Sequence, residues 1–461
     1  MALVAGIDSS TQSTKISLYD ADDGTVLASN SAPHPDGTAV DPRAWLDALT
    51  AAGDGLIEQS AAVSVGGQQH GMVLLDDDGQ PVHDALLWND TRSAGAAASL
   101  IDELGGAAAW AAAVGSLPVA SFTVTKLRWV ADHAPDAARR ARSVLLPHDW
   151  LTWHLTGHGE QVTDRGDASG TGYWSPATNS YRGDLLAAAF RRPLAVPRVL
   201  DPAGAAGETA WGAVVAPGTG DNMGAALGLG LTTGDAVVSI GTSGTVFAVA
   251  DEPTADASGV VAGFADATGR YLPLVCTLNA ARNLSATATM LGVSLAELDG
   301  LALSAEPGAG GLTFVPYLDG ERTPNLPDAT GSLLGMTRAN LTPANVARAA
   351  VEGLLCGLAD GLDALRQLGV PVSRALLVGG GAKSRAVQHL AADVLGVPVV
   401  VPAPQEYVAR GAARQAAWVL SRAAEPPQWP LDVLATHEPS GSPSTVRSAY
   451  AERRATWVPR R

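Results

Sequence analysis

Residues 3–19 read LVAGIDSSTQSTKISLY, two stretches of apolar character joined by small polar residues. Leu3 to Ile7 has the continuous apolar pattern of a buried strand. Lys15 to Tyr19 alternates polar and apolar residues before a turn at Asp22 to Gly24. This pattern predicts a β-hairpin with a polar tip, Asp8 to Ser13.

A second hairpin of the same kind is predicted much later in the chain. Ala236 to Ile240 supplies its first strand, Gly241 to Gly244 (GTSG) its tip, and Thr245 to Ala250 its second strand. Small residues leave backbone N–H groups and hydroxyls free to converge on an anion, which is one way in which proteins hold phosphates. Each tip alone could be an ordinary turn. Two of them, one in each half, indicate two lobes that face one polyphosphate.

The rest of the chain alternates predicted helices with predicted strands. Helical patterns cover 44–60, 94–110, 343–368 and 384–395, and strand patterns cover 61–66, 375–378 and 397–401. This alternation predicts an α/β protein with mixed β-sheets flanked by helices, followed beyond Ala423 by a loop and one short terminal helix.

Two domains are predicted because 461 residues exceed what one hydrophobic core usually supports. The segment from Pro217 to Gly230 is dense in glycine and alanine and is the candidate hinge. The predicted domains are residues 1–225 and 226–461.

Composition and charge exclude several classes of function. The net charge of −16 repels nucleic acid and anionic membrane surfaces, so neither is an expected partner. Cys276 and Cys356 lie in apolar sequence, and their spacing suggests neither a metal site nor a disulfide framework. No basic leader, cleavage site or apolar span of about 20 residues marks the start of the sequence. The expected location is the cytoplasm.

Asp221 is the candidate catalytic carboxylate. It stands in the glycine-rich turn Pro217 to Asn222 (PGTGDN), just before a helix predicted near Met223. Phosphoryl transfer to an alcohol asks for positioning, charge neutralisation and one carboxylate that accepts the hydroxyl proton. Asp221 could instead only cap the helix. Asp8 could be a turn residue, or a carboxylate that holds Mg²⁺ through water against the phosphates of ATP.

Further polar groups follow predicted strands. Gly66 to Gly71 (GGQQHG) places Gln69 and His70 at a strand end, where their neutral side chains could hydrogen-bond the hydroxyls of a sugar, although a lone His is often structural. In Leu87 to Arg92 (LWNDTR), an Asp–Arg pair could brace this pocket or contact the ligand directly. Gly379 to Ser384 (GGGAKS) could approach a nucleotide, but it lacks the glycine before Lys that a Walker A loop requires.

Taken in order, these segments resemble the carbohydrate kinases of the FGGY family and, within it, the xylulokinase group. The resemblance runs along almost the whole chain. The matching segments are Gly6 to Lys15, Gln68 to Gly71, Leu87 to Arg92, Ser121 to Trp129, Leu146 to Asp149, Thr163 to Thr171, Gly220 to Asn222, Ser239 to Gly244, Pro316 to Pro324, Glu352 to Gly353 and Gly379 to Ser384.

The resemblance implies two actin-like domains with ribonuclease H-like cores and an interdomain cleft that closes over ATP and a sugar. It implies ATP-dependent phosphorylation of D-xylulose to D-xylulose 5-phosphate, with Asp221 as general base and Asp8 as an acidic group near the metal and the phosphates. The implied sugar contacts are Gln69, His70, Asp221 and Asn222. The implied ATP contacts are Thr11, Gly241, Thr242, Ser243, Gly380, Gly381 and Arg385. Mg²⁺ would be held by Asp8 and Asp221 through water.

Two positions depart from the family pattern. Gln69 stands where many xylulokinases have Met, and Ala286 stands roughly where several relatives have a Trp near the adenine. The acceptor could therefore be another pentulose such as ribulose, a hexulose or a polyol, and the nucleotide affinity is expected to be modest. A non-catalytic actin-like ATPase is a further hypothesis, which Asp221, Asp8 and the GTSG tip oppose. Whether the chain forms a homodimer is left open.

Overall fold

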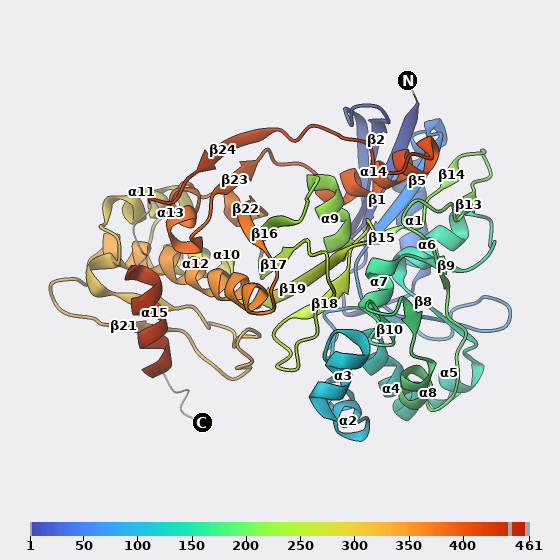
Figure 1. Ribbon diagram of the computed structural model, residues 1–461, viewed down its shortest axis with the longest axis horizontal. Coiled ribbons are helices and arrows are strands. Elements are labelled where there is room, and N and C mark those ends of the chain that lie inside the picture. The colour runs from blue at the N-terminus through green and yellow to red at the C-terminus, as the bar shows by residue number, and fades with distance from the viewer. Residues whose placement is uncertain (1, 441–444, 457–461) are drawn as a thin grey trace. The chain divides into compact units, whose positions relative to one another are not determined.

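The computed structural model describes residues 2–440 and 445–456 (Figure 1). The chain falls into two compact units. Unit 1 comprises the residues up to Leu231 together with Asp251–Leu272 and Gln405–Pro430, and unit 2 comprises Thr232–Ala250, Pro273–Pro404 and the described residues from Leu431 onward. The units are thus not two continuous halves. The predicted boundary at residue 225 falls inside helix α9 (Asp221–Leu229). The return of two later segments to unit 1 was not predicted, because local sequence patterns do not tell which sheet a later segment packs against.

Unit 1 holds most of the short strands. Its strands are β1 (Leu3–Ser9), β2 (Ser13–Asp20), β3 (Val26–Pro33), β4 (Ala39–Val40), β5 (Ala62–Gly67), β6 (Val73–Leu75), β7 (Ala85–Leu86), β8 (Ser143–Leu145), β9 (Val162–Thr163), β10 (Trp174–Ser175), β11 (Ser180–Tyr181), β12 (Arg198–Val199), β13 (Gly207–Glu208), β14 (Val214–Val215), β15 (Thr219–Gly220) and β18 (Ala262–Ala265). Its helices are α1 (Arg43–Gly53), η1 (Ile57–Gln59), α2 (Ala94–Glu103), α3 (Gly106–Val114), α4 (Thr123–His133), α5 (Pro135–Arg140), α6 (Pro147–Leu155), α7 (Arg165–Ser169), α8 (Gly183–Phe190), α9 and α14 (Tyr407–Ser421).

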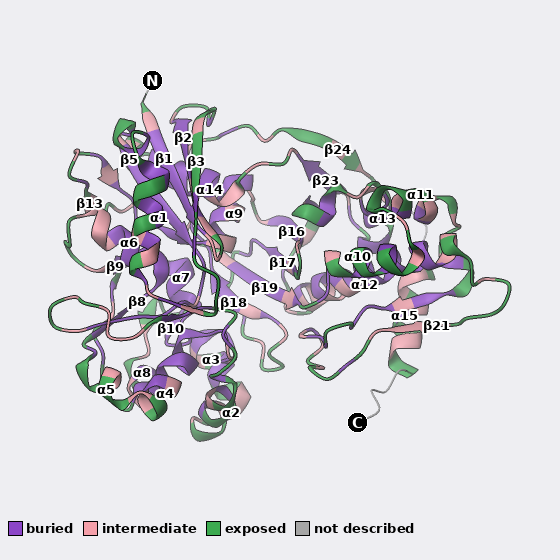
Figure 2. Ribbon diagram, turned by 180° about the vertical axis from the view of Figure 1, so that it is seen from behind, coloured by how far each residue is buried: buried purple, intermediate pink, exposed green. Residues whose placement is uncertain are grey.

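The main sheet of unit 1 has seven strands among the described residues, in the order β13-β14-β5-β1-β2-β3 with β15 also paired to β5. β1 and β2 form the predicted antiparallel hairpin, and β1 runs parallel to β5. β1 and β5 are buried along almost their whole length, as Figure 2 shows in purple, which is why both read as apolar runs. One prediction was wrong in detail: Asp8 lies within β1, opposite Lys15, and the tip of the hairpin lies between Ser9 and Ser13.

The candidate hinge is mostly helix α9, which packs against α14 within unit 1 (Figure 1). A Cβ on Gly228 would lie 2.1 Å from the carbonyl oxygen of Tyr407, and one on Gly411 would lie 1.8 Å from that of Gly224. Real side chains do not approach backbone this closely, so the glycines permit the two helices to touch. The glycine and alanine content therefore reflects helix packing.

Unit 2 is built on a second mixed sheet. Its strands are β16 (Gly234–Ile240), β17 (Gly244–Ala248), most of β19 (Tyr271–Thr277), β20 (Thr313–Val315), β21 (Ser332–Leu334), β22 (Val372–Val378), β23 (Val399–Pro402) and β24 (Val433–His437). Its helices are α10 (Ala281–Leu291), α11 (Leu295–Ser304), η2 (Ala309–Gly311), α12 (Pro343–Gln367), η3 (Gly380–Lys383), α13 (Arg385–Leu395) and α15 (Thr445–Thr456). The order β19-β17-β16-β22-β23-β24 combines the predicted antiparallel hairpin β16–β17 with the parallel pairs β16–β22 and β22–β23. The predicted α/β class with mixed sheets is confirmed.

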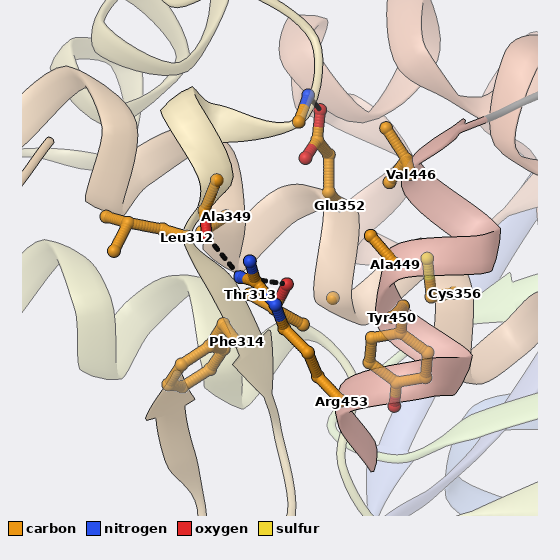
Figure 3. Close-up of a pocket in the computed structure, with 13 residues that line it drawn as sticks. Leu312, Thr313, Phe314, Ala349, Glu352, Cys356, Val446, Ala449, Tyr450 and Arg453 are labelled. Atoms are coloured by element: carbon orange, nitrogen blue, oxygen red, sulfur yellow. Dashed lines mark hydrogen bonds between the residues drawn. The ribbon is translucent and has the colours of Figure 1, made fainter. Parts of the chain in front are cut away.

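The short terminal helix predicted after Ala423 is present as α15, but part of the predicted loop before it is the strand β24. β24 pairs antiparallel with β23, and helix α15 packs on α12 and β20. In the close-up of Figure 3, Arg453 of α15 donates to the carbonyl oxygen of Gly311 and to Thr313 Oγ1, beside a cavity of about 40 Å³ that Glu352 and Tyr450 also line. β24 was missed because it is a short, largely exposed edge strand whose residues do not show the alternating burial of a half-buried strand.

Across the described ranges, no single helix is long and apolar enough to cross a membrane. Only α10 and α11 taken together meet a length and composition criterion, and they are bent by 88° at the break between them.

Candidate active site

Three parallel strand ends in unit 1 gather the predicted sugar-side residues. β5 lies between β1 and β15, with Gly67 opposite Ser9 on one side and Gly220 on the other. Because parallel neighbours end at the same edge of a sheet, the residues that follow them come together there, where open α/β sheets bind ligands. Asp8, at the end of β1, thus shares this edge with two segments, Gln68 to His70 and Asp221 to Asn222.

Asp221 is the first residue of α9, and the helix N-cap is Gly220. The side chain of Asp221 is therefore not the cap, but its Oδ1 accepts hydrogen bonds from the backbone N–H of Asn222 at 2.7 Å and from Asn222 Nδ2 at 2.9 Å. Burial raises the pKa of Asp221 to about 7; the Asn222 hydrogen bonds oppose this rise, and the negative charge of Asp8 adds to it. Asp221 is a carboxylate whose direction is fixed by its neighbour.

Asp8 is buried at the end of β1 and accepts a hydrogen bond from Ser10 Oγ at 2.6 Å. Burial raises the pKa of Asp8 to about 6, against the Ser10 hydrogen bond and the attraction of Lys15. Thr11, in the same tip, accepts from Trp88 Nε1 at 2.8 Å and donates to Gln68 Oε1 at 3.4 Å. The first tip is therefore tied by side chains to the segment that follows β5.

Gln69 carries a donor for which the described protein supplies no partner. Its Oε1 accepts from Asn222 Nδ2 at 3.1 Å, which fixes the orientation of the amide, whereas its Nε2 is buried and unpaired among the described residues. The Nε2 of Gln68 is in the same state. An unsatisfied buried donor costs roughly 1–3 kcal/mol. Both amides are therefore suited to a ligand or a water that accepts hydrogen bonds.

His70 adopts a left-handed backbone conformation with φ of 67°. Its Nδ1 lies 2.7 Å from the carbonyl oxygen of Gly170, and its ring stacks on Phe122 with centroids 4.7 Å apart. A carbonyl oxygen can only accept, so Nδ1 carries a proton and donates this hydrogen bond.

A cluster of four charged residues lies beneath this edge of the sheet, and its members fall in two of the matching sequence segments, Leu146 to Asp149 and Thr163 to Thr171, for which no chemistry was predicted. His148 Nε2 is 3.3 Å from Asp149, 3.2 Å from Asp164 and 3.2 Å from Asp167, and all four side chains are buried. Burial alone would favour neutral imidazole, but the three carboxylates raise the pKa of His148 to about 9. Burial raises the pKa of Asp149 to about 6 and that of Asp167 well above its usual range. His148 is therefore a buried cation held by carboxylates.

His148 touches both segments that carry the candidate residues. A Cβ on Gly67, at the end of β5, would lie 2.9 Å from His148 Cβ, and one on Gly218, just before β15, would lie 2.4 Å from its Nδ1. The polar residues at the start of α6, within an otherwise apolar stretch, were the available signal for this cluster.

In the second predicted polar segment, Leu87 to Arg92, side-chain contacts hold Asp90 and Arg92 together. Asp90 is buried and accepts from Arg92 Nε at 2.8 Å and from Thr38 Oγ1 at 2.8 Å. The guanidinium of Arg92 also lies over the ring of Trp129, 5.0 Å from its centroid. Of the two alternatives, an Asp–Arg pair that braces the pocket and one that contacts the ligand directly, these contacts support the brace.

The predicted nucleotide residues gather at one edge of the unit 2 sheet. β16 and β22 are parallel neighbours, with Ser239 opposite Val378, and they are followed by the Gly241–Gly244 turn and by η3. A Cβ on Gly381 would lie 2.3 Å from Ile240 Cγ2, so this glycine lets η3 approach β16. Thr242, Ser243 and Gly380 are exposed there.

Arg385 begins α13, and its backbone N–H donates to Asp299 Oδ2 at 2.8 Å. Its neighbour Ser384 donates to the other oxygen of Asp299 at 2.5 Å. The structure therefore fixes the backbone at Arg385 and leaves the residue exposed.

Family models match both parts of the chain. The model described as "FGGY family of carbohydrate kinases, N-terminal domain" matches residues 3–228, and that described as the C-terminal domain of the same family matches residues 236–420. The chain belongs to the FGGY family of carbohydrate kinases. The predicted family is confirmed, and as a carbohydrate kinase the chain is a phosphotransferase that acts on a sugar and ATP.

Similar proteins cover nearly the whole of this FGGY kinase. The xylulose kinases of Streptomyces coelicolor and Streptomyces rubiginosus are each 49% identical to it, over 91% of this chain and 88% of theirs. The crystal structure of xylulose kinase from Bifidobacterium adolescentis has a TM-score of 0.91 at 46% identity and covers 98% of this chain and 99% of that chain.

A kinase of this family uses a divalent cation with its nucleotide, and Asp8 and Asp221 are the residues that fit one. Their oxygens are hard ligands, and the charge of Asp8 reaches Asp221 strongly enough to raise its pKa. No group of three or more His, Cys, Asp and Glu side chains arranged for a metal occurs in the part of the chain that the structure describes. Mg²⁺ needs no such group, since it commonly takes one or two carboxylates and completes its shell with water and substrate phosphates.

Proposed function

We propose that this FGGY kinase phosphorylates D-xylulose to D-xylulose 5-phosphate at the expense of ATP. The assignment of the substrate rests on one observation, the 49% identity to two xylulose kinases over 91% of the chain. The arrangement of Asp221, Asn222 and Gln69 at one sheet edge supports a site for a polyhydroxylated ligand.

Asp221 is the proposed general base. The N–H and Nδ2 of Asn222 hold one oxygen of its carboxylate and leave the other for the reacting hydroxyl. As that hydroxyl attacks phosphorus, Asp221 accepts its proton, and the positive end of the α9 dipole stabilises the carboxylate beforehand. The remaining work of phosphoryl transfer is positioning and charge neutralisation.

Gln69, His70 and Asn222 are the proposed sugar contacts. The Nε2 of Gln69 is a donor without a protein partner in the described chain, and with Nδ1 as the donor to Gly170, Nε2 of a neutral His70 ring would act as an acceptor. A donor and an acceptor fixed at one edge recognise a hydroxyl pattern by its geometry. This recognition carries no net charge, which suits a neutral sugar.

The proposed ATP contacts outside the first tip lie in unit 2, at Gly241, Thr242, Ser243, Gly380, Gly381 and Arg385. Thr11 is the proposed contact of the first tip. We propose Mg²⁺ as the cation, held by Asp8 and Asp221 through water, where it would neutralise phosphate charge during transfer. The cytoplasmic location and the homodimer stay predictions.

The second candidate acceptor is another pentulose, a hexulose or a polyol. The amide of Gln69 favours it, because this amide offers a donor where a Met side chain has none. Coupled release of ADP, measured with D-xylulose, L-ribulose, D-ribulose, glycerol and gluconate, separates the candidates. We expect the highest kcat/KM for D-xylulose. A higher value for any other acceptor would reassign the substrate while leaving the kinase chemistry in place.

Replacing Gln69 by Met tests the sugar contact. The change removes a donor without a partner and also the acceptor of Asn222 Nδ2, so we expect kcat/KM for the sugar to fall about tenfold with the KM for ATP unchanged. Steady-state kinetics with each substrate varied in turn measure this. Gln59→Met is the matched control, because Gln59 is exposed on η1. Equal kinetics for wild type and Gln69→Met would remove Gln69 from the sugar site.

A further inference from the structure

The backbone of His70 is held in a conformation that its sequence alone does not favour. Its φ of 67° lies in the left-handed region, which costs a residue other than glycine roughly 1–2 kcal/mol. The carbonyl oxygen of His70 accepts two hydrogen bonds from helix α4, one from Lys126 Nζ at 2.9 Å and one from Thr123 Oγ1 at 3.2 Å. These two donors fix the peptide plane that follows the imidazole.

Lys126 is an unusual residue to find at this position, because its side chain is 0% exposed. Lysine is almost never fully buried unless it is paired. The two hydrogen bonds of its Nζ go to backbone carbonyls, that of His70 and that of Ser121 at 2.7 Å. Burial lowers the pKa of Lys126 to about 7, and the negative charge of Asp90 acts against that fall.

The bond to Ser121 connects Lys126 to the second support of the His70 ring. Ser121 immediately precedes Phe122, whose ring stacks on His70, and Phe264 of β18 lies against the same imidazole with centroids 5.8 Å apart. The Nζ of Lys126 therefore fixes both the backbone of His70 and the backbone next to the aromatic ring on which His70 rests.

We propose that Lys126 is a positioning residue for sugar binding. It acts by holding the backbone of His70 in its left-handed conformation and by keeping the His70 ring stacked on Phe122. The inference rests on the proposed role of His70 as a sugar contact. It also gives a physical role to the segment Ser121 to Trp129, which the sequence marks as a family motif and to which no chemistry had been attached. Lys126 itself touches backbone only, so its effect on the sugar passes through His70.

Three variants of helix α4 test this role. Lys126→Met keeps much of the length of the side chain and removes both hydrogen bonds to carbonyls. Thr123→Val removes the weaker bond to the same carbonyl of His70. Arg128→Met is the matched control, since Arg128 is a second buried cation of α4 and donates to the carbonyl of Ala189 at 3.2 Å and to Glu103, but not to His70 or Phe122.

The first measurement is steady-state kinetics on the full chain. For Lys126→Met we expect the KM for the sugar to rise about tenfold, with the KM for ATP unchanged. Thr123→Val should give a smaller change in the same direction, and Arg128→Met should change neither KM even where its melting temperature falls. An equal rise in both KM values, or the same sugar effect in Arg128→Met, would show a general structural role and overturn the proposal.

The second measurement does not depend on the identity of the sugar. In protein labelled with ¹⁵N-histidine, with the His70 signals assigned by the variant His70→Asn, we expect wild type to show one set of ring signals with Nδ1 protonated. Lys126→Met should shift or split those signals, whereas Arg128→Met should leave them in place. Unchanged His70 signals in Lys126→Met would overturn the proposal. Inactivity of wild type on xylulose, with the His70 response still present, would refute the proposed substrate and leave the positioning role intact.

Discussion

Replacing Asp221 by Asn is expected to lower kcat by about 10²- to 10⁴-fold, the range for loss of a general base. The Asn side chain has nearly the same shape, and its Oδ1 can still accept the backbone N–H of Asn222, which now lies 2.7 Å from Asp221 Oδ1. It cannot take up the proton of the attacking hydroxyl. We therefore expect an intact fold, with the main loss in turnover, as measured by ADP release at saturating sugar and ATP.

Asp184→Asn is the control for this variant. Asp184 also lies in the first turn of a helix, α8, but it is exposed and paired with Arg182. This control should keep wild-type kcat and show that loss of a helix-start carboxylate does not itself abolish turnover. If Asp221→Asn retained kcat within a factor of about ten, Asp221 would not be the base, and the acceptor proton would have to leave by another route.

Local sequence patterns located much of the fold. The hairpins β1–β2 and β16–β17 were predictable because, in each, two neighbouring segments with the hydrophobic pattern of a strand are joined by a tip of small residues. Helix α12 was predicted almost to the residue, since a long amphipathic stretch begins with Thr342 as N-cap and Pro343 in the first turn. Such features depend on neighbours in the chain.

The assignment of elements to units could not be predicted in the same way. α14 belongs to unit 1 although it follows most of unit 2 in the sequence. Its place depends on close approaches such as that of Gly6, where a Cβ would lie 1.8 Å from the carbonyl oxygen of Ala409. A glycine in a strand does not reveal which distant helix it admits.

Some residues of the candidate site could likewise be predicted from local sequence, and others could not. Gln69, His70 and Asp221 could be proposed because each follows a strand directly, and parallel strands deliver such residues to one edge. The His148 cluster could not, because its members come from α6, from α7 and from the N-cap of α7, and meet only in the folded chain. The role proposed for Lys126 likewise could not be predicted, because it depends on a hydrogen bond to the carbonyl oxygen of His70, 56 positions away in the sequence.

Replacing His148 by Leu is expected to lower the free energy of unfolding by about 3–5 kcal/mol, the usual cost of removing one partner from a buried ion pair. His148 is the cation within 3.3 Å of Asp149, Asp164 and Asp167, and all three carboxylates stay buried without it. Urea unfolding at pH 7 measures the loss. The deficit should shrink near pH 5, because burial already raises the pKa values of Asp149 and Asp167 and protonation then removes their charge. His133→Leu is the control, since His133 is exposed on α4.

The same cluster predicts how the stability of the wild-type protein depends on pH. The folded pKa of His148, about 9, lies above its ordinary value of 6.5. Its contribution is therefore fully present below pH 6.5 and is lost as the pH rises through 9, an effect of about 3 kcal/mol from the size of the shift. The raised pKa values of Asp149 and Asp167 also make the stability fall as the pH rises, in a lower pH range. These two residues therefore do not offset the loss of stability that comes from His148. Urea unfolding between pH 7 and 10 should show the wild type losing stability while His148→Leu loses much less. Parallel curves for the two proteins would mean that His148 is not charged in the folded state, and that the buried carboxylates are neutralised by their own protons instead.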